Sequence, residues 1–341
     1  MSSATAPAPT ASGSPRKLIA VIVLVPVIVA LALWAFAWPA SRTAPRDLPL
    51  GVAGPTAAVT QVEQQLSQRE GAFEIHRYAD EGAAREAIED RTVYGAVVVT
   101  EQGPKLLTAT AASPLVAQLL QQAVAAGAPE GTQVPTVDVV AAPADDPRGG
   151  VLSASVLPLA IAGVAAGALA TLMGLRGMRA VAGLVGAAAL VGIVGAALAH
   201  SWLGALTGDW WTEAGAIALS TLAVSAAVAG LAALLGQAGI ALGAVTVVLF
   251  GNPFSGVASA PQLLPEPAGF IGQLLPPGAG GSLIRSVAFF DGAGATGPAV
   301  TLGTWALVGL SLVLIGGARK RTAPAAESPT PANAPQPATV G

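Results

Sequence analysis

The sequence predicts a multi-pass α-helical membrane protein with six transmembrane helices and an extracytoplasmic α/β domain between the first and second of them. Three observations lead to this fold class. The 341 residues are 53% hydrophobic and only 10% charged, whereas charged residues make up about 25% of soluble proteins. Apolar runs of about 20 residues, the length that crosses a bilayer as a helix, recur along the chain. One long charged stretch, residues 42–150, separates the first run from the others.

Six apolar runs carry none of the chain's Lys, Arg, Asp or Glu residues. In order they are Leu18–Trp38, Ala154–Leu175, Ala180–Leu206, Ala214–Leu235, Ile240–Val257 and Pro298–Gly317. The first is longer than the 7–15 apolar residues of a typical signal peptide, so we expect a retained anchor. The five later runs define a membrane domain over residues 154–317. The Ala-, Pro-, Ser- and Thr-rich tails, residues 1–17 and 318–341, are predicted to be disordered.

The orientation follows from the basic residues in the short flanks of the runs, which favour the cytoplasm. Six passes place three basic groups on one side: Arg16 and Lys17, Arg176 and Arg179, and Arg319 to Arg321. The links on the other side are mainly acidic, with Asp209, Glu213, Glu266 and Asp291 against the single Arg285. We therefore expect a plasma (inner) membrane protein, surrounded by the lipid bilayer, with both termini cytoplasmic and residues 42–150 outside.

Residues 42–150 alternate strand and helix patterns, which predicts a small α/β domain with a mixed sheet. The predicted strands are Leu48–Val52, Phe73–Tyr78, Val93–Thr100, Lys105–Ala109 and Val134–Val140. The predicted helices are Ala57–Arg69, a second helix that Asp80 caps and that ends near Asp90, and a third that Ser113 caps and that ends near Ala126.

Composition and motifs exclude most catalytic chemistry. The chain has no Cys and only two His residues, His76 and His200, so we expect no metal site, no cofactor and no enzyme activity. His76 is interpreted as a surface residue and His200 as an interfacial residue near the outer end of its span. A net charge of −3 gives no basic field for nucleic acid. No Lys follows a phosphate-binding G-x-x-x-x-G pattern, so any ATP hydrolysis must occur on another polypeptide.

Small residues recur in the apolar runs and indicate close helix packing. Gly163 and Gly167 form a G-x-x-x-G pair in the second run, a spacing that lets two helix backbones approach closely. We expect this pair to lie at a helix–helix contact.

The outer link, residues 251–297, is apolar but interrupted by prolines. Its Gly251-Asn252-Pro253 sequence should end or bend the fifth run, Gly269–Leu275 is interpreted as a short turn, and Ser282–Phe290 as a helix with Arg285 off its apolar face. We expect a re-entrant or lid segment over a central passage, a dimer interface, or else a plain surface loop. The candidate residues of this segment are Asn252, Pro253, Ser255, Gly256, Pro265, Pro276, Pro277, Gly278, Arg285, Phe289, Phe290 and Asp291.

Several of these motifs resemble a known family. The segments that carry the similarity to ABC-2-type transporter permeases are Asn252–Gly256, Leu264-Pro265, Leu274–Ala279 and Ser286–Gly292, together with the Tyr94–Val99 strand. They are particularly similar to the branch of YhgE/Pip (phage infection protein)-like membrane proteins. The resemblance implies a homo- or heterodimeric permease subunit driven by a separate ABC ATPase subunit, which exports a lipid, polymer or amphipathic compound.

A second function from a different class stays open. The chain can instead be a non-transporting envelope scaffold or receptor, associated with phage infection or secretion, whose outer domain binds a partner. Deleting the outer domain would then abolish function, whereas disrupting the outer link would not.

Overall fold

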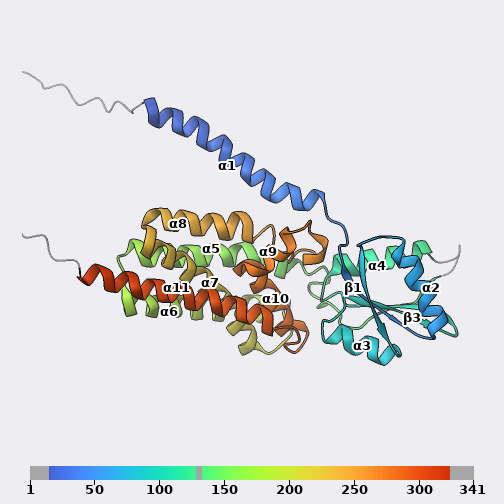
Figure 1. Ribbon diagram of the computed structural model, residues 1–341. Helices are drawn as coiled ribbons and strands as arrows, with labels where there is room; N and C mark the ends of the chain where they lie inside the picture. The colour runs from blue at the N-terminus through green and yellow to red at the C-terminus, as the bar shows by residue number, and fades with distance from the viewer. Residues whose placement is uncertain (1–14, 128–132, 323–341) are drawn as a thin grey trace, which may run out of the picture.

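The computed structural model describes residues 15–127 and 133–322, which form a helical bundle and an α/β domain placed end to end (Figure 1). Residues 1–14 and 323–341 lie outside the described residues, and so does the disorder predicted for them. The first helix already begins at Pro15 and the last ends at Thr322. Both helices therefore extend a few residues into the ranges 1–17 and 318–341 that were predicted as tails.

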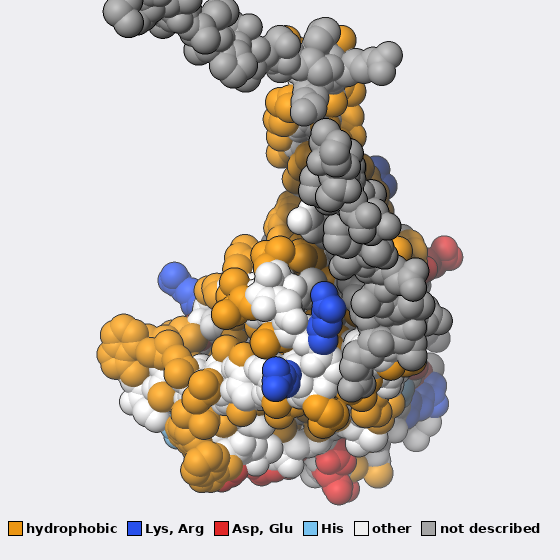
Figure 2. All heavy atoms as spheres, turned by 90° about the vertical axis from the view of Figure 1, so that its left-hand side faces the viewer, with side chains coloured by type: hydrophobic (Ala, Val, Ile, Leu, Met, Phe, Trp, Pro, Cys, Tyr) orange, Lys and Arg blue, Asp and Glu red, His pale blue; other side chains and the backbone are white. Residues whose placement is uncertain are grey.

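Within the described ranges, five helices are long and apolar enough to cross a membrane. They are α1 (Pro15–Ser41), α5 (Gly150–Leu172), α6 (Gly177–Ala196) with its π-helical continuation η1 (Ala197–Trp202), α7 (Trp210–Leu235) and α11 (Thr296–Thr322). Figure 2, which views the bundle from the end away from the α/β domain, shows hydrophobic side chains over its outer surface. These features support a multi-pass membrane protein.

The fifth predicted span, Ile240–Val257, forms a shorter helix than expected. Helix α8 (Gln237–Ala244) and the π-helical η2 (Val245–Gly251) form one apolar rod, and the following Asn252-Pro253 turn ends it. The rod is about 20 Å long, since each helical residue adds about 1.5 Å, and this is less than the ~30 Å of a bilayer core. Where six full-length spans were predicted, the described residues therefore form five long apolar helices and one short one.

Helix α7 is the centre of the bundle. It packs against α5, α6, α8 and α11, and 67% of its most apolar window is buried, compared with 6% for α1. Helix α1 leans away from the others in Figure 1 and approaches them near its C-terminal end, next to the α/β domain. There Trp34 and Trp38 stack on each other and contact the ring of Phe254 edge-on, with centroid distances of 6.5 and 6.2 Å.

The α/β domain contains a five-stranded mixed sheet in the order β2-β1-β3-β4-β5, with only the β3–β4 pair antiparallel. Its elements are β1 (Leu48–Ala53), α2 (Thr56–Ser67), β2 (Phe73–Tyr78), α3 (Glu81–Glu89), β3 (Gly95–Thr100), β4 (Gly103–Thr108), α4 (Pro114–Gly127) and β5 (Thr136–Asp138). The predicted last strand, Val134–Val140, is therefore much shorter than expected. Asp80 accepts the N–H of Ala83 at 2.9 Å and so caps α3.

Helices cover both faces of this sheet. Helix α3 lies on one face, where Ala84 and Ile88 pack against Ala96 and Val98. Helices α2 and α4 lie on the other face (Figure 1). Because successive strand residues point to opposite faces, the neighbour Val97 joins this second core instead.

Residues 252–295 connect the short rod to α11 and fold between the bundle and the α/β domain. They contain the 3₁₀ turn η3 (Pro261–Leu263), α9 (Ala268–Leu274) and α10 (Pro276–Phe289). The interpretation of Gly269–Leu275 as a turn was wrong, because this stretch is helical, and the helix predicted from Ser282 begins six residues earlier. Helix α10 packs against α5, α7, α9 and α11.

Candidate functional site

Helix α10 begins deep inside the bundle. Its first residues, Pro276 and Pro277, line a small cavity of about 20 Å³ together with Ala160 of α5 and Val224 of α7. Both of these residues lie near the middle of their long helices. The chain therefore enters the bundle from the side of the α/β domain, reaches about half its depth, and returns along α10.

The two prolines explain how a helix can begin in such an apolar place. The first four N–H groups of a helix have no partner within the helix, and leaving them unpaired away from water costs free energy. Pro276 and Pro277 occupy the first positions of α10 and have no N–H to satisfy. Gly278 follows, where a Cβ atom would lie 2.1 Å from the carbonyl oxygen of Gly272, so this contact between α9 and α10 requires glycine.

The other end of α10 is joined to the α/β domain. The Phe290 ring is 6% exposed and belongs to the hydrophobic core formed by α3 and the sheet. Arg91, just after α3, donates a hydrogen bond to the Ser282 carbonyl oxygen at 3.1 Å and another to the Ser286 hydroxyl. Its guanidinium also lies 5.3 Å from the centroid of the Phe290 ring, within the range of a cation–π contact.

Arg285 lies at the centre of this junction. Arg285 was predicted to lie off the apolar face of its helix, but its side chain is only 6% exposed because the α/β domain covers that side of α10. Its Nη2 donates to the Val257 carbonyl oxygen at 2.7 Å, and its buried Nε has no hydrogen-bond partner.

Two cavities adjoin Arg285. One, of about 270 Å³, lies toward β3 and α9 and is also lined by Arg91, Tyr94, Gln262 and Gln273. Desolvation lowers the pKa of the Arg91 guanidinium and raises the pKa of the Tyr94 phenol, so both groups favour their less charged form more than they would in water. The other cavity, of about 350 Å³, lies toward α4 and the start of α5.

The predicted site residues of the 251–260 loop lie next to the contact between α10 and the α/β domain. Asn252 and Pro253 form the turn after η2, where the Ser255 hydroxyl donates to the Asn252 carbonyl oxygen at 2.7 Å. Gly256 has a φ of +66°, a left-handed conformation that favours glycine. The Gln273 side-chain amide donates to the Ser255 carbonyl oxygen at 2.7 Å, which ties the loop to α9.

The three remaining predicted residues of the segment are Pro265, Phe289 and Asp291. The Pro265 side chain is buried just before α9, and its carbonyl oxygen accepts the N–H of Ala268 at 2.8 Å. Phe289 is half-buried and lines the 350 Å³ cavity. Asp291 is exposed and has a φ of +48° in the turn that follows α10. Asp291 is therefore a turn residue of the junction rather than part of either cavity.

Gly163 and Gly167 lie in the bundle, away from the junction. Both are buried in α5, where added Cβ atoms would lie 2.6 Å from the Val224 Cβ and 2.6 Å from the Ser225 carbonyl oxygen. The pair therefore brings α5 within backbone contact of α7 in the same chain.

Some polar residues of the site could not be expected from the sequence. Arg91 and Tyr94 belong to the distant α/β domain, and no local pattern links them to α10. Glu213 was predicted to lie in a short link between two spans, but it lies in the first turn of α7 with 0% exposure. Asp209, the helix N-cap immediately before Trp210, was the only available signal that α7 begins early.

Within residues 15–127 and 133–322 no group of three His, Asp or Glu side chains is arranged to hold a metal ion. Asp146, which lies in the linker before α5, instead caps that helix by accepting the N–H groups of Gly150 and Val151 at 2.7 and 2.8 Å. His76 lies 3.5 Å from Glu74 on the edge strand β2.

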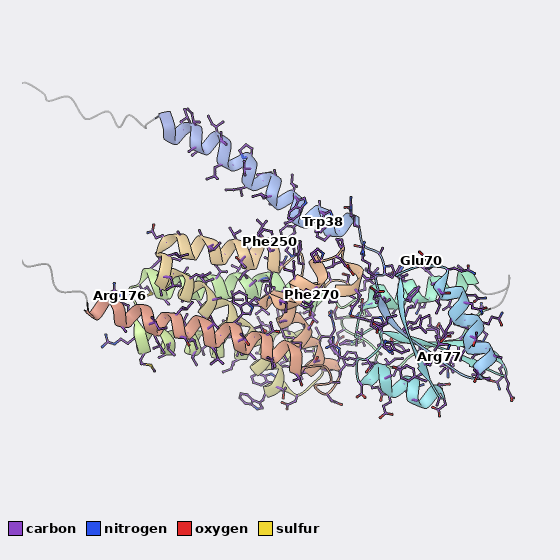
Figure 3. All side chains as sticks on the ribbon, viewed as in Figure 1. Trp38, Glu70, Arg77, Arg176, Phe250 and Phe270 are labelled. Carbon is purple, nitrogen blue, oxygen red and sulfur yellow. The ribbon has the colours of Figure 1, made fainter. Side chains whose placement is uncertain are left out.

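Figure 3 summarises the arrangement of the two ends. Trp38 and Phe270 lie near the junction, Glu70 and Arg77 on the α/β domain, and Arg176 at the opposite end of the bundle.

Comparison with curated proteins and with solved structures gives no match. Residues 16–175, which include α1, the α/β domain and α5, match the family model of the ABC-2 family transporter protein, and this supports a membrane permease of an ABC-type system.

Proposed function

We propose that the chain is the permease subunit of an ABC-2-type export system. It would cross the membrane six times, dimerise, and move a lipid, polymer or amphipathic compound outward with energy from a separate ATPase. The observation that carries this proposal is that α10 begins about halfway into an apolar helical bundle. Residues 16–175 of the same chain match an ABC-2 family model. Backbone that turns at membrane depth is tolerated only where protein encloses it or where it lines a passage.

The orientation in this proposal rests on the two ends of the bundle. Arg176 lies at the end remote from the α/β domain (Figure 3), and Arg179 follows in the first turn of α6. Figure 2 shows Lys and Arg side chains facing the viewer at that end, with the acidic groups in view only at the margins. Basic flanks favour the cytoplasm, so the α/β domain and the entrance to α10 would be outside.

The short α8–η2 rod is compatible with six passes. Phe250, near the end of the rod, contacts the ring of Phe254, which in turn contacts Trp38 of α1. Protein packed against this end of the rod would make up the missing length. A branch assignment to YhgE/Pip-like proteins remains part of this proposal, since the family match is to the broader ABC-2 description.

The alternative of a receptor or scaffold predicts an outer domain that works independently of the membrane part. The shared core at Phe290 favours the permease instead, because it joins the domain mechanically to the helix that reaches half-depth. A receptor requires no such joint, so the two functions differ in what a break at this joint would do.

The experiment that tests the proposal is purification of the full chain in mild detergent, followed by identification of bound proteins and measurement of ATP hydrolysis. We expect a P-loop ATPase to co-purify with the chain. Substitution of the phosphate-binding Lys of that ATPase should stop efflux in cells, although the ATPase stays bound to the permease. Absence of an ATPase together with unchanged efflux on deletion of the chain would contradict the proposal.

A further inference from the structure

The cavity between the α/β domain and α9–α10 carries an unbalanced positive charge. Arg91 and Arg285 both line it, and its remaining polar groups include Tyr94, Gln262 and Ser282. None of its lining residues is acidic. Guanidinium groups keep their proton in proteins, so the cavity holds two positive charges.

Buried charges are normally paired, because removing an ion from water costs several kcal/mol when no partner compensates it. The ion pairs of the described residues involve other side chains, and neither Arg91 nor Arg285 takes part in one. Arg285 is only 6% exposed, and its Nε, which also has no hydrogen-bond partner, is fully enclosed. Among the described residues, no acidic side chain therefore balances the charges of Arg91 and Arg285.

We propose that the cavity of Arg91 and Arg285 binds a phosphate group, supplied either by a lipid headgroup or as free phosphate. Two guanidinium groups offer paired N–H donors that match the oxygen atoms of phosphate. The Tyr94 hydroxyl, which donates to Gln262 at 2.9 Å, lies on the same wall and keeps the amide oriented. An occupied site would bridge β3 of the domain and α10.

The neighbouring cavity favours the lipid source. It shares Arg285 and has a volume of about 350 Å³. Leu115, Leu152 and Phe289 form an apolar part of its wall, and Asp146 and Arg148 form a charged part. An amphipathic molecule whose phosphate binds the two arginines would need to place its apolar part past Arg285, along Leu115, Leu152 and Phe289. The lipid source rests on the proposed function, because it needs this junction to lie at the membrane surface, whereas phosphate binding itself does not.

The test uses the full chain in mild detergent, with thermal unfolding and native mass spectrometry as readouts. The probes are phosphatidylglycerol, diacylglycerol with the same acyl chains, and inorganic phosphate. We expect phosphatidylglycerol to bind and to raise Tm, and diacylglycerol to do neither. Stabilisation by inorganic phosphate equal to that by the lipid would assign the site to free phosphate, and stabilisation by the lipid alone would assign it to a headgroup.

The variants Arg285→Gln and Arg91→Gln should each weaken phosphate or phosphatidylglycerol binding by about tenfold or more, since each removes charge-assisted hydrogen bonds. Arg69→Gln is the matched control, because it removes the same charge from an exposed position of the α/β domain. If Arg285→Gln does not fold, Arg285→Lys keeps the charge without the paired donors and should bind with intermediate affinity.

Unchanged binding in both Arg91→Gln and the folded Arg285 variant would overturn the phosphate site. So would a diacylglycerol that binds and raises Tm as much as phosphatidylglycerol does. This result is independent of the export proposal. Failure to find an ATPase partner would contradict the export proposal but leave phosphate binding intact. Conversely, an Arg91→Gln variant with unchanged lipid binding and ATP-driven efflux would contradict the phosphate site but leave the export proposal standing.

Discussion

His200 Nδ1 lies 2.9 Å from Oε2 of Glu213, a carboxylate whose surface is completely covered. The other oxygen, Oε1, accepts the backbone N–H of Gly208 at 2.8 Å. A buried carboxylate is stable only with such partners. This pair therefore fixes the loop between η1 and α7, at the end of the bundle that bears the α/β domain.

Replacing Glu213 with Ala should lower the free energy of unfolding by about 1–3 kcal/mol, because the Gly208 N–H would be left buried without an acceptor. Glu213→Gln keeps an acceptor oxygen and should cost less. Thermal unfolding in detergent measures both, with the exposed Glu86→Ala as the control. Equal stability of Glu213→Ala and the control would show that the buried contacts contribute nothing.

Gly167→Ala should destabilise the bundle by about 1–3 kcal/mol, the usual cost of inserting a methyl group into a close-packed contact. Its Cβ would lie 2.6 Å from the Ser225 carbonyl oxygen of α7. Gly186→Ala in α6 is the matched control, since nothing lies within 4 Å of its added Cβ, and Ala favours a helix over Gly. A Gly167→Ala variant as stable as Gly186→Ala would mean that α5 and α7 do not pack this closely.

Local patterns in the sequence predicted most elements of the fold. The β1 and β2 strands begin at Leu48 and Phe73 as predicted, because alternating side chains mark a strand from within its own residues. Asp80 likewise marks the start of α3 through a contact only three residues away. The long apolar helices follow from length and hydropathy alone.

The candidate site could be predicted only in part. The Pro276-Pro277 pair marked the outer link as unusual, but its half-depth position depends on packing against Ala160 and Val224, which are far away in sequence. Similarly, Arg285 looked like the solvent-facing residue of an amphipathic helix. Its burial depends on the α/β domain, whose Arg91 lies 191 residues from Ser282, its hydrogen-bond partner.

The Glu81 carboxylate should make the α/β domain less stable in acid. Its pKa is lowered mainly by the hydrogen bond from Lys105, at 2.6 Å. The pKa of Glu81 is lower in the folded protein than in the unfolded protein. The stabilisation that Glu81 contributes is therefore complete above about pH 5 and is lost as the pH falls through the folded pKa. Thermal unfolding of the full chain between about pH 6 and pH 3 should show a smaller acid-dependent loss for Glu81→Gln than for the unsubstituted protein. Parallel pH curves would contradict this assignment.

The orientation of the chain can be tested directly, because the protein has no Cys. We expect the Glu86→Cys variant, substituted in α3, to react with a membrane-impermeant maleimide on intact cells. A Cys at Ser328→Cys, in the C-terminal tail, should react only after the membrane is permeabilised. The opposite pattern would invert the topology and with it the proposed direction of transport.

Phe290→Ala should uncouple the α/β domain from the bundle. Truncating a buried Phe costs about 3–5 kcal/mol, and the lost contacts are those between the domain core and the end of α10. The domain keeps the rest of its two-sided core, so we expect it to stay folded while α10 and the 251–260 loop exchange amide hydrogens faster. Phe270→Ala is the control, since that ring is 71% exposed. If the export proposal is correct, Phe290→Ala also lowers efflux although the domain is intact, whereas a receptor would keep its partner binding. Unchanged exchange in α10 would show that the Phe290 contact does not hold the two parts together.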